Sequence, residues 1–206
     1  DHAKIILGKT MFDEAEIKPP KAATRRSILF MSRFEKRKGC LELLEAFALL
    51  APRFPDLDLI MAGDGPEAHL LNAKVAQHGL LSRVFLPGYV SGDAKADFLA
   101  TSTIFALPTT HQEGMPIALL EAMAAGKPIL TTKAGGIPRL IQEPENGLFL
   151  EDVSPEAIAE GLRRLLNDFQ LCRAMSQRNA SDARAYAAPN VVAEIEDAYR
   201  AIRGGA

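Results

Sequence analysis

The sequence predicts a single α/β domain, built on a mostly parallel sheet of about six strands with helices covering both faces. From residue 28 onward, short apolar runs alternate with stretches of helical periodicity. The apolar runs are unbroken instead of alternating with polar residues, which is typical of strands buried on both faces. The chain has 206 residues, 48% hydrophobic and 24% charged, as expected of one soluble domain with a real core.

Each element is bounded by signals in the chain. Gly63-Asp64-Gly65-Pro66 ends a strand and starts a helix, and Ser154-Pro155 caps another helix. The expected strands are 28–32, 57–62, 84–86, 104–107, 129–132 and 148–150. The expected helices are 40–51, 66–78, 93–101, 116–125, 136–142 and 155–167. Ligands bind beyond the carboxyl ends of such strands. We therefore expect convergence on one edge of the residues that follow the strands, namely Arg33, Gly63, Gly88, Glu113 and Gly135.

The two flanks differ from this central part. Residues 1–27 contain Lys18-Pro19-Pro20-Lys21 and indicate an extended link segment. Residues 168–203 indicate two helices, the second beginning near Asn190 with apolar residues spaced for one face. The expected division is a link over 1–27, a ligand-binding domain over 28–168 and C-terminal helices over 169–206. Because the chain opens without an initiator methionine, we expect it to be a piece of something longer.

Composition excludes several classes of function. A net charge of −2 gives no sign of a bulk surface for nucleic acid or anionic membrane. Cys40 and Cys172 lack metal-ligand spacing, which fits a reducing compartment, and no His/Cys/Asp/Glu set is spaced for a metal. No apolar run approaches the roughly 20 residues that span a bilayer, and no signal peptide is visible. We expect a cytoplasmic protein without a metal or cofactor.

The most informative segment runs from Glu113 to Glu121. Pro116 favours the first turn of a helix, which we expect to bury a stripe of Ile117, Leu120 and Ala124. At roughly 100° per residue, Glu121 lies about 40° from Ile117 and so faces inward. A buried acid needs a polar partner. Two acids that can accept hydroxyls, beside a helix N-terminus that attracts phosphate, suggest a sugar nucleotide. The alternative is a surface acid and a helix-face acid paired with a lysine.

Other segments have weaker signals. Arg33 and Lys38 lie in a basic loop suited to phosphate oxygens, or the loop is simply a solvated turn. Gly88, in Leu86-Pro87-Gly88-Tyr89-Val90, lets a nucleotide base lie against the backbone, or merely turns the chain. Gly135-Gly136 is a common kind of turn, and His111 has the position of an exposed loop histidine.

Taken together and in order, these segments resemble the C-terminal domain of a GT-B glycosyltransferase of the large retaining group called family 4. The resemblance covers about residues 28–168, and it depends on the order and spacing of several motifs that are weak singly. The motifs are Ser32-Arg33 with Lys38-Gly39, Gly63-Asp64-Gly65-Pro66, Leu86-Pro87-Gly88-Tyr89-Val90, Glu113-Gly114 with Glu121-Ala122-Met123-Ala124-Ala125-Gly126-Lys127-Pro128, Gly135-Gly136-Ile137-Pro138 and Asn146-Gly147-Leu148.

The resemblance implies a Rossmann-like domain that binds a nucleoside diphosphate sugar. Arg33 and Lys38 would hold the donor diphosphate, Glu121 the ribose hydroxyls, and the backbone near Gly88 the base. Glu113, with the backbone of Gly114, Met115, Pro116 and Ile117, would hold the donor sugar and its phosphate. Transfer in this group retains anomeric configuration and needs no metal, so neutralising the departing diphosphate is the main electrostatic task.

The chain also departs from the family pattern. Ser32 replaces the usual glycine before the arginine, and Arg139 replaces the usual glutamate after Gly-Gly-Ile-Pro. The resemblance implies an N-terminal domain that binds the acceptor and makes any membrane contact, and we expect that domain to lie outside this chain. We therefore expect donor binding without turnover. The alternatives are half of a GT-B epimerase or phosphorylase, and a non-catalytic nucleotide-sugar module on the same fold.

Overall fold

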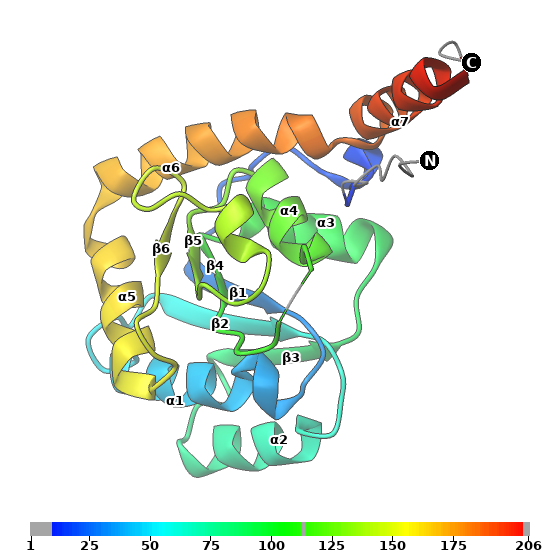
Figure 1. The fold of residues 1–206 in the computed structure, drawn as a ribbon. Helices are drawn as coiled ribbons and strands as arrows, with labels where there is room; N and C mark the ends of the chain where they lie inside the picture. Colours follow the sequence, from blue (N-terminus) through cyan, green and yellow to red (C-terminus); the bar gives the residue numbers. More distant parts are fainter. Residues whose placement is uncertain (1–9, 113, 204–206) are drawn as a thin grey trace.

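The computed structural model describes residues 10–112 and 114–203, which form a three-layer α/β structure around one six-stranded sheet (Figure 1). All strand pairs are parallel, and the strand order is β3-β2-β1-β4-β5-β6. The strands are β1 (Arg26–Met31), β2 (Leu57–Ala62), β3 (Val84–Gly88), β4 (Ile104–Leu107), β5 (Ile129–Thr131) and β6 (Gly147–Phe149). The predicted fold class is confirmed.

Helices lie on both faces of the sheet. In Figure 1, α1, α2 and α5 lie on one side, α3 and α4 lie on the other, and α6 runs across α4 and leads to α7. The helices are α1 (Cys40–Leu50), α2 (Ala68–Gln77), α3 (Gly92–Thr101), α4 (Ile117–Ala124), α5 (Pro155–Asn167), α6 (Phe169–Asp182) and α7 (Ala188–Arg203). Short 3-10 turns are η1 (Glu14–Glu16), η2 (Lys36–Lys38), η3 (Ile137–Arg139) and η4 (Ala183–Tyr186).

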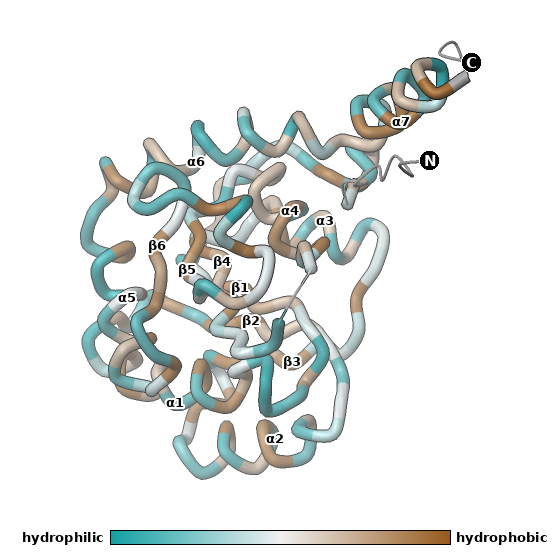
Figure 2. Tube along the Cα trace, viewed as in Figure 1, coloured by the Kyte–Doolittle hydropathy of each residue, from teal (hydrophilic) through white to brown (hydrophobic). Residues whose placement is uncertain are grey.

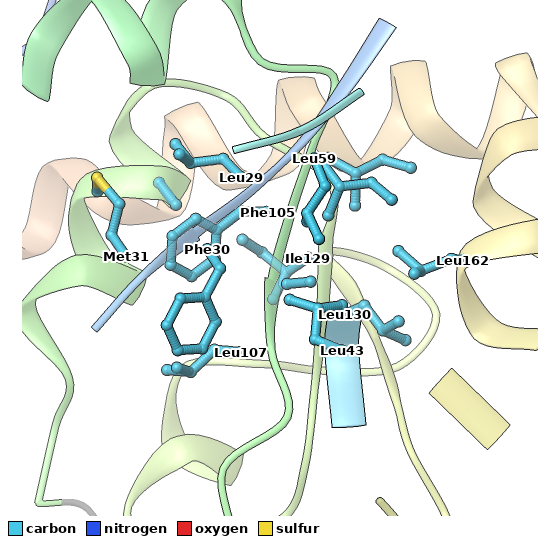
Figure 3. Packing of buried hydrophobic residues seen from close by; sticks show 14 of the residues in the cluster. Leu29, Phe30, Met31, Leu43, Leu59, Phe105, Leu107, Ile129, Leu130 and Leu162 are labelled. Atoms are coloured by element: carbon cyan, nitrogen blue, oxygen red, sulfur yellow. The ribbon is translucent and has the colours of Figure 1, made fainter. Parts of the chain in front are cut away.

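The core follows from strands that are apolar on both faces. Figure 2 shows hydrophobic residues concentrated along the central strands and hydrophilic ones along the outer helix surfaces. Phe30, Phe105 and Ile129 are fully buried in the sheet, and Leu43 of α1 and Leu162 of α5 pack from one side (Figure 3). Burying such side chains contributes about 1.5–3 kcal/mol each, which fixes the strands that position the loops at the sheet edge.

Most of the predicted bounds differ from the structure by one or two residues, and three of the differences concern the segment before β6, the start of α4 and the start of α7. The helix expected over 136–142 is only the 3-10 turn η3, because Gly135-Gly136 precedes it and Pro144 disfavours helical backbone at the residue before it. Pro116 is the N-cap of α4 with an extended ψ of 120°, so the helix begins one residue later than expected. The last helix begins at Ala188, before Asn190.

Between residue 10 and β1 the chain contains the short turn η1 and is attached to the rest of the domain at two places. Phe12 forms a parallel bridge to Ala187, and η1 lies against α3. Within the described ranges, 10–112 and 114–203, no helix is both long and apolar enough to cross a membrane.

Candidate donor-binding site

A cleft of about 580 Å³ opens at the carboxyl ends of the strands, on the side of α3 and α4. In the sequence of strands, β1 pairs with both β2 and β4, so the strand order reverses direction between β1 and β4. Open α/β sheets form a crevice at such a switch point. The lining residues come from β1 and the loop after it, the loops after β2 and β3, α3 and α4: Met31, Ser32, Arg33, Ala62, Gly63, Asp64, Gly65, Tyr89, Val90, Ser91, Lys95, Ile117, Ala118 and Glu121.

One wall of the cleft consists of two loops in close contact. The Phe34 N–H donates to the Asp64 carbonyl at 2.9 Å, joining the loop after β1 to the loop after β2. A Cβ at Gly63 would lie 2.0 Å from the Ser32 carbonyl oxygen, so only glycine permits this approach. The Gly63-Asp64-Gly65 turn therefore has a structural role in shaping the wall.

The basic loop contains an internal carboxylate. Glu35 accepts from Arg33 Nε at 2.8 Å on one oxygen and from Arg37 Nε at 2.7 Å on the other. The hydrogen bond from Arg37, with the nearby charges of Arg37, Arg33 and Lys38, lowers the pKa of Glu35 below its ordinary value. Among the described residues, Arg33 is held at Nε only, and its side chain is 68% exposed, which leaves its two terminal nitrogens accessible beside the cleft.

The same loop is attached to the loop after β4, which leads to α4. The Arg37 carbonyl accepts from the Thr110 N–H at 2.9 Å and from the Thr109 hydroxyl at 3.1 Å. Gly39 has a φ of 70°, and a Cβ there would lie 2.2 Å from the Pro108 carbonyl oxygen. Gly39 is thus required for the contact that aligns the two loops.

α4 presents one face to the cleft. Ile117 and Glu121 share that face, as their spacing predicts, but Ile117 is 52% exposed and so does not belong to a buried stripe. The core side of α4 is formed instead by Leu119, Leu120, Ala122 and Met123. Glu121 is only 7% exposed although it lies on the cleft face, because the loops and α3 surround it.

The buried carboxylate of Glu121 has a cationic partner. Lys95 of α3 donates from Nζ to Glu121 Oε1 at 2.6 Å and also pairs with Glu16 of η1. Burial lowers the pKa of Lys95, but the hydrogen bonds from its ammonium to Glu121 and Glu16 outweigh that effect, so the pKa is raised. The lysine pairing considered as an alternative for Glu121 is therefore present, in a half-enclosed position that also lines the cleft.

The cleft brings together some of the predicted site residues. Arg33, Ile117 and Glu121 line it. Lys38 is half-buried in η2, and Gly88 ends β3 just before the lining residue Tyr89. Gly114, Met115 and Pro116 lead into α4 without contributing to the lining found for the described residues. Glu113 lies outside the described residues, so its role stays a prediction from the resemblance.

Sequence reasoning missed Lys95. Its position in the helix expected over 93–101 was available, but a lysine on an amphipathic helix gives no signal of its own until its partner is known. Glu35 was within the basic loop but was not assigned a role; its two-residue spacing from Arg33 and from Arg37 was the available signal.

A larger hollow of about 870 Å³ lies elsewhere along the same edge, between the ends of β4, β5 and β6 and α5. It contains none of the predicted site residues, and four acids and two cations are among the residues around it. Size alone does not favour it over the cleft at the switch point. Among the residues that the structure describes, no group of three or more His, Cys, Asp or Glu side chains could hold a metal ion.

Comparison with known proteins gives a consistent result. The sequence profile described as "Glycosyl transferases group 1" matches residues 11–182. The chain is 30% identical over 177 residues to N-acetyl-alpha-D-glucosaminyl L-malate synthase of Bacillus anthracis, covering 85% of this chain and 45% of that protein. The chain spans about half the length of the curated relatives it matches.

Two solved structures are similar in fold. HepE of Anabaena, crystallised with UDP and glucose, matches with a TM-score of 0.81 and 21% identity over 95% of this chain and 56% of its own. The C-terminal domain of LpcC, a glycosyl transferase group 1 family protein of Francisella tularensis, has a TM-score of 0.75 and 25% identity. That match covers 84% of this chain and 97% of the LpcC domain. The predicted likeness to a C-terminal GT-B domain is confirmed.

Proposed function

Since this chain belongs to the glycosyl transferases group 1 family, we propose that it is the donor-binding half of a retaining glycosyltransferase. The intact enzyme would transfer a hexose from a nucleoside diphosphate sugar to an acceptor without a metal ion. The observation that carries the proposal is that one cleft is lined by both a cationic and an anionic group, the exposed guanidinium of Arg33 and the buried carboxylate of Glu121. A nucleoside diphosphate offers phosphate oxygens to the first and ribose hydroxyls to the second.

The diphosphate is the leaving group, and its charge grows as the glycosidic bond breaks. Cations fixed in place before the reaction stabilise that charge without reorganisation. Glu35 holds Arg33 at Nε, so the two terminal nitrogens remain for a bidentate contact with phosphate. Lys38, at the end of η2, adds a compact charge to the same contact.

The donor sugar would lie toward the start of α4. At the start of this eight-residue helix the N–H groups of Ile117 and Ala118 are available to an anion, because those of Leu119 and Leu120 donate to the Pro116 carbonyl. We assign the sugar hydroxyls to Glu113. The acceptor would be bound by a partner domain N-terminal to this one, together with any membrane contact, in a cytoplasmic enzyme. The isolated chain would then bind donor and show no sustained transfer.

Calorimetric titration of the chain with UDP, GDP and ADP in EDTA tests the proposal. We expect at least one nucleotide to bind, and Arg33→Met to weaken it by about tenfold or more, because a charge-assisted phosphate contact contributes roughly 1.5–3 kcal/mol. Arg37→Met is the matched control: it removes an equal charge from the same loop and the same carboxylate, outside the cleft lining. No binding of any of the three, binding that disappears in EDTA, or equal loss in both variants would contradict the assignment.

A further inference from the structure

The amine of Lys95 lies between two carboxylates from distant parts of the chain. It donates to Glu121 Oε1 at 2.6 Å, and it pairs with Glu16 of η1. The side chain of Lys95 is 16% exposed and that of Glu121 is 9% exposed, whereas that of Glu16 is 42% exposed. The Lys95–Glu121 pair is therefore the enclosed part of the arrangement, and Glu16 closes it from the solvent side.

Only part of the Glu121 carboxylate is used by this pair. An ionised carboxylate has about four lone-pair positions on its two oxygens, and Lys95 occupies one of them on Oε1. The described residues give Oε2 no hydrogen bond. A carboxylate with one oxygen fixed by a cation and the other unoccupied, in the lining of a cleft, is oriented to accept further donors.

The neighbouring contacts explain why Lys95 stays in place. Lys18 pairs with Asp93 and Asp97 at 2.9 Å each, and the Lys21 N–H donates to the Ala100 carbonyl at 3.0 Å. These contacts attach residues 13–21 along α3, so several independent bonds hold Glu16 in position beside Lys95. The ammonium lies near the N-terminus of α3, where the helix dipole disfavours a cation, and the two carboxylates compensate for that.

We propose that Lys95 is a positioning residue that acts on the donor through Glu121, fixing its carboxylate to accept the two ribose hydroxyls, with Glu16 as the second anchor of the ammonium. The inference deepens the proposed function and rests on it. It assigns to Lys95 an effect on the ribose alone, since the amine holds the carboxylate and would contact neither phosphate nor base. Loss of Lys95 should therefore remove the preference for ribose hydroxyls and spare the rest of the affinity.

The readout is the ratio of two dissociation constants, measured by calorimetry for UDP, GDP and ADP and for their 2′,3′-dideoxy forms. We expect the unmodified chain to prefer the ribose form by about tenfold, and Lys95→Met to reduce that ratio toward one while dideoxy binding changes little. An unchanged ratio in Lys95→Met would overturn the proposal. Equal weakening of both forms would also overturn it, because Lys95 would then contact another part of the nucleotide.

A second variant keeps the test decisive if Lys95→Met does not fold. Glu16→Gln retains the Lys95–Glu121 pair and removes only the more exposed anchor, so we expect the ratio to fall by about two- to fivefold. An unchanged ratio in this variant would remove Glu16 from the arrangement and overturn the proposal as stated. Failure of the unmodified chain to bind any ribose form would instead contradict the proposed function itself.

Lys18→Met is the matched control. It loosens the same segment from the same helix, at Asp93 and Asp97, without reaching Glu121. We expect its thermal stability to fall while the ribose preference is kept. If Lys18→Met lowers the ratio as much as Glu16→Gln, the effect comes from general loosening of residues 13–21 and the positioning role is wrong.

Discussion

Two lysines lie at opposite ends of α3, and their surroundings differ in kind. Lys95, near the N-terminus at the cleft, pairs with the carboxylates of Glu121 and Glu16. Lys127 follows α4 in the chain, but its side chain reaches the C-terminal end of α3. It is 4% exposed and donates to the main-chain carbonyls of Ala100 at 3.1 Å and Ser102 at 2.9 Å. The pKa of Lys95 is raised, whereas burial lowers that of Lys127 to about 8. The cleft thus holds a lysine that keeps its proton beyond its ordinary pKa, and the scaffold holds one that loses its proton above about pH 8.

The difference shows what each end of the helix is built for. Carbonyls at a helix C-terminus need donors, and a lysine supplies them whether or not it keeps its extra proton. A carboxylate in a binding cleft has to stay ionised and also keep acceptor positions for a ligand. It therefore needs a nearby positive charge that occupies only one of its acceptor positions. A lysine therefore satisfies main-chain carbonyls at one end of α3, and another lysine holds a binding-site carboxylate at the other end.

The largest expected effect concerns Lys127. Below pH 8 both the folded and the unfolded chain hold its proton; between about 8 and its ordinary value of 10.5, only the unfolded chain does. Stability rises with pH wherever the unfolded state binds more protons, so the free energy of unfolding should rise across this range by up to about 3 kcal/mol. Lys127→Met should lose that rise, measured by urea denaturation at several pH values.

The control and the other lysine sharpen this result. Lys133→Met removes an exposed lysine at the opposite end of β5, and should keep the rise. Lys95 is not expected to contribute to it, because a raised pKa gives stability that is lost only as pH climbs above 10.5. If Lys127→Met and the unmodified chain have parallel pH profiles between 8 and 10.5, the two lysines do not differ as described.

The next effect is at the cleft. Glu121→Gln keeps the volume of the side chain but removes the charge that accepts the ribose hydroxyls, so nucleotide affinity should fall by about tenfold to a hundredfold. The sequence alone predicts little change in unliganded stability; the pair with Lys95 revises this to a loss of roughly 1 kcal/mol, since the ammonium retains Glu16. Calorimetry and thermal melting measure the two quantities.

A matched acid separates the site from the scaffold. Glu45 of α1 is half-buried, more exposed than Glu121, and pairs with Lys74 and His78 of the neighbouring α2 region, away from the cleft. Glu45→Gln should lower stability by a similar amount and leave nucleotide affinity unchanged. If Glu121→Gln affects stability alone, as Glu45→Gln is expected to, Glu121 is a structural acid and the ribose assignment is wrong.

The sheet could be predicted from sequence because its strands are buried on both faces. Runs such as residues 28–32 and 57–62 lack a polar face, so they can be recognised from the sequence as strands buried on both faces. The glycine turns are required by close backbone contacts, such as that of Gly63 with Ser32. Where the local signal was short, the prediction failed: one 3-10 turn fits between Gly136 and Pro144, and periodicity over so few residues cannot tell it from a helix.

The site could be predicted only in part, for a similar reason. Arg33 and Glu121 belong to motifs with fixed spacing from a strand end or a helix start. Their partners are set by tertiary contacts: Lys95 is 26 residues from Glu121 and 79 from Glu16. Helical periodicity correctly predicted that Ile117 and Glu121 share one face of α4. It could not predict that this face borders a cleft instead of the core.

The smallest expected effect tests whether the two acids of the site divide their work. Glu121 should act on the nucleoside and Glu113 on the sugar, so Glu113→Gln should leave the affinity for UDP, GDP and ADP unchanged. It should weaken the corresponding sugar nucleotides, with UDP-glucose as the first probe, by about three- to tenfold, because glutamine still accepts one hydrogen bond in place of two. Gln112→Ala, one residue earlier and exposed, is the control and should change neither ligand. The comparison is made on the ratio of sugar-nucleotide to nucleotide affinity, which any general disturbance of the loop would leave constant. Equal losses for both ligands in Glu113→Gln and in Glu121→Gln would mean that the two acids form one undivided contact, and the roles assigned to them separately would not hold.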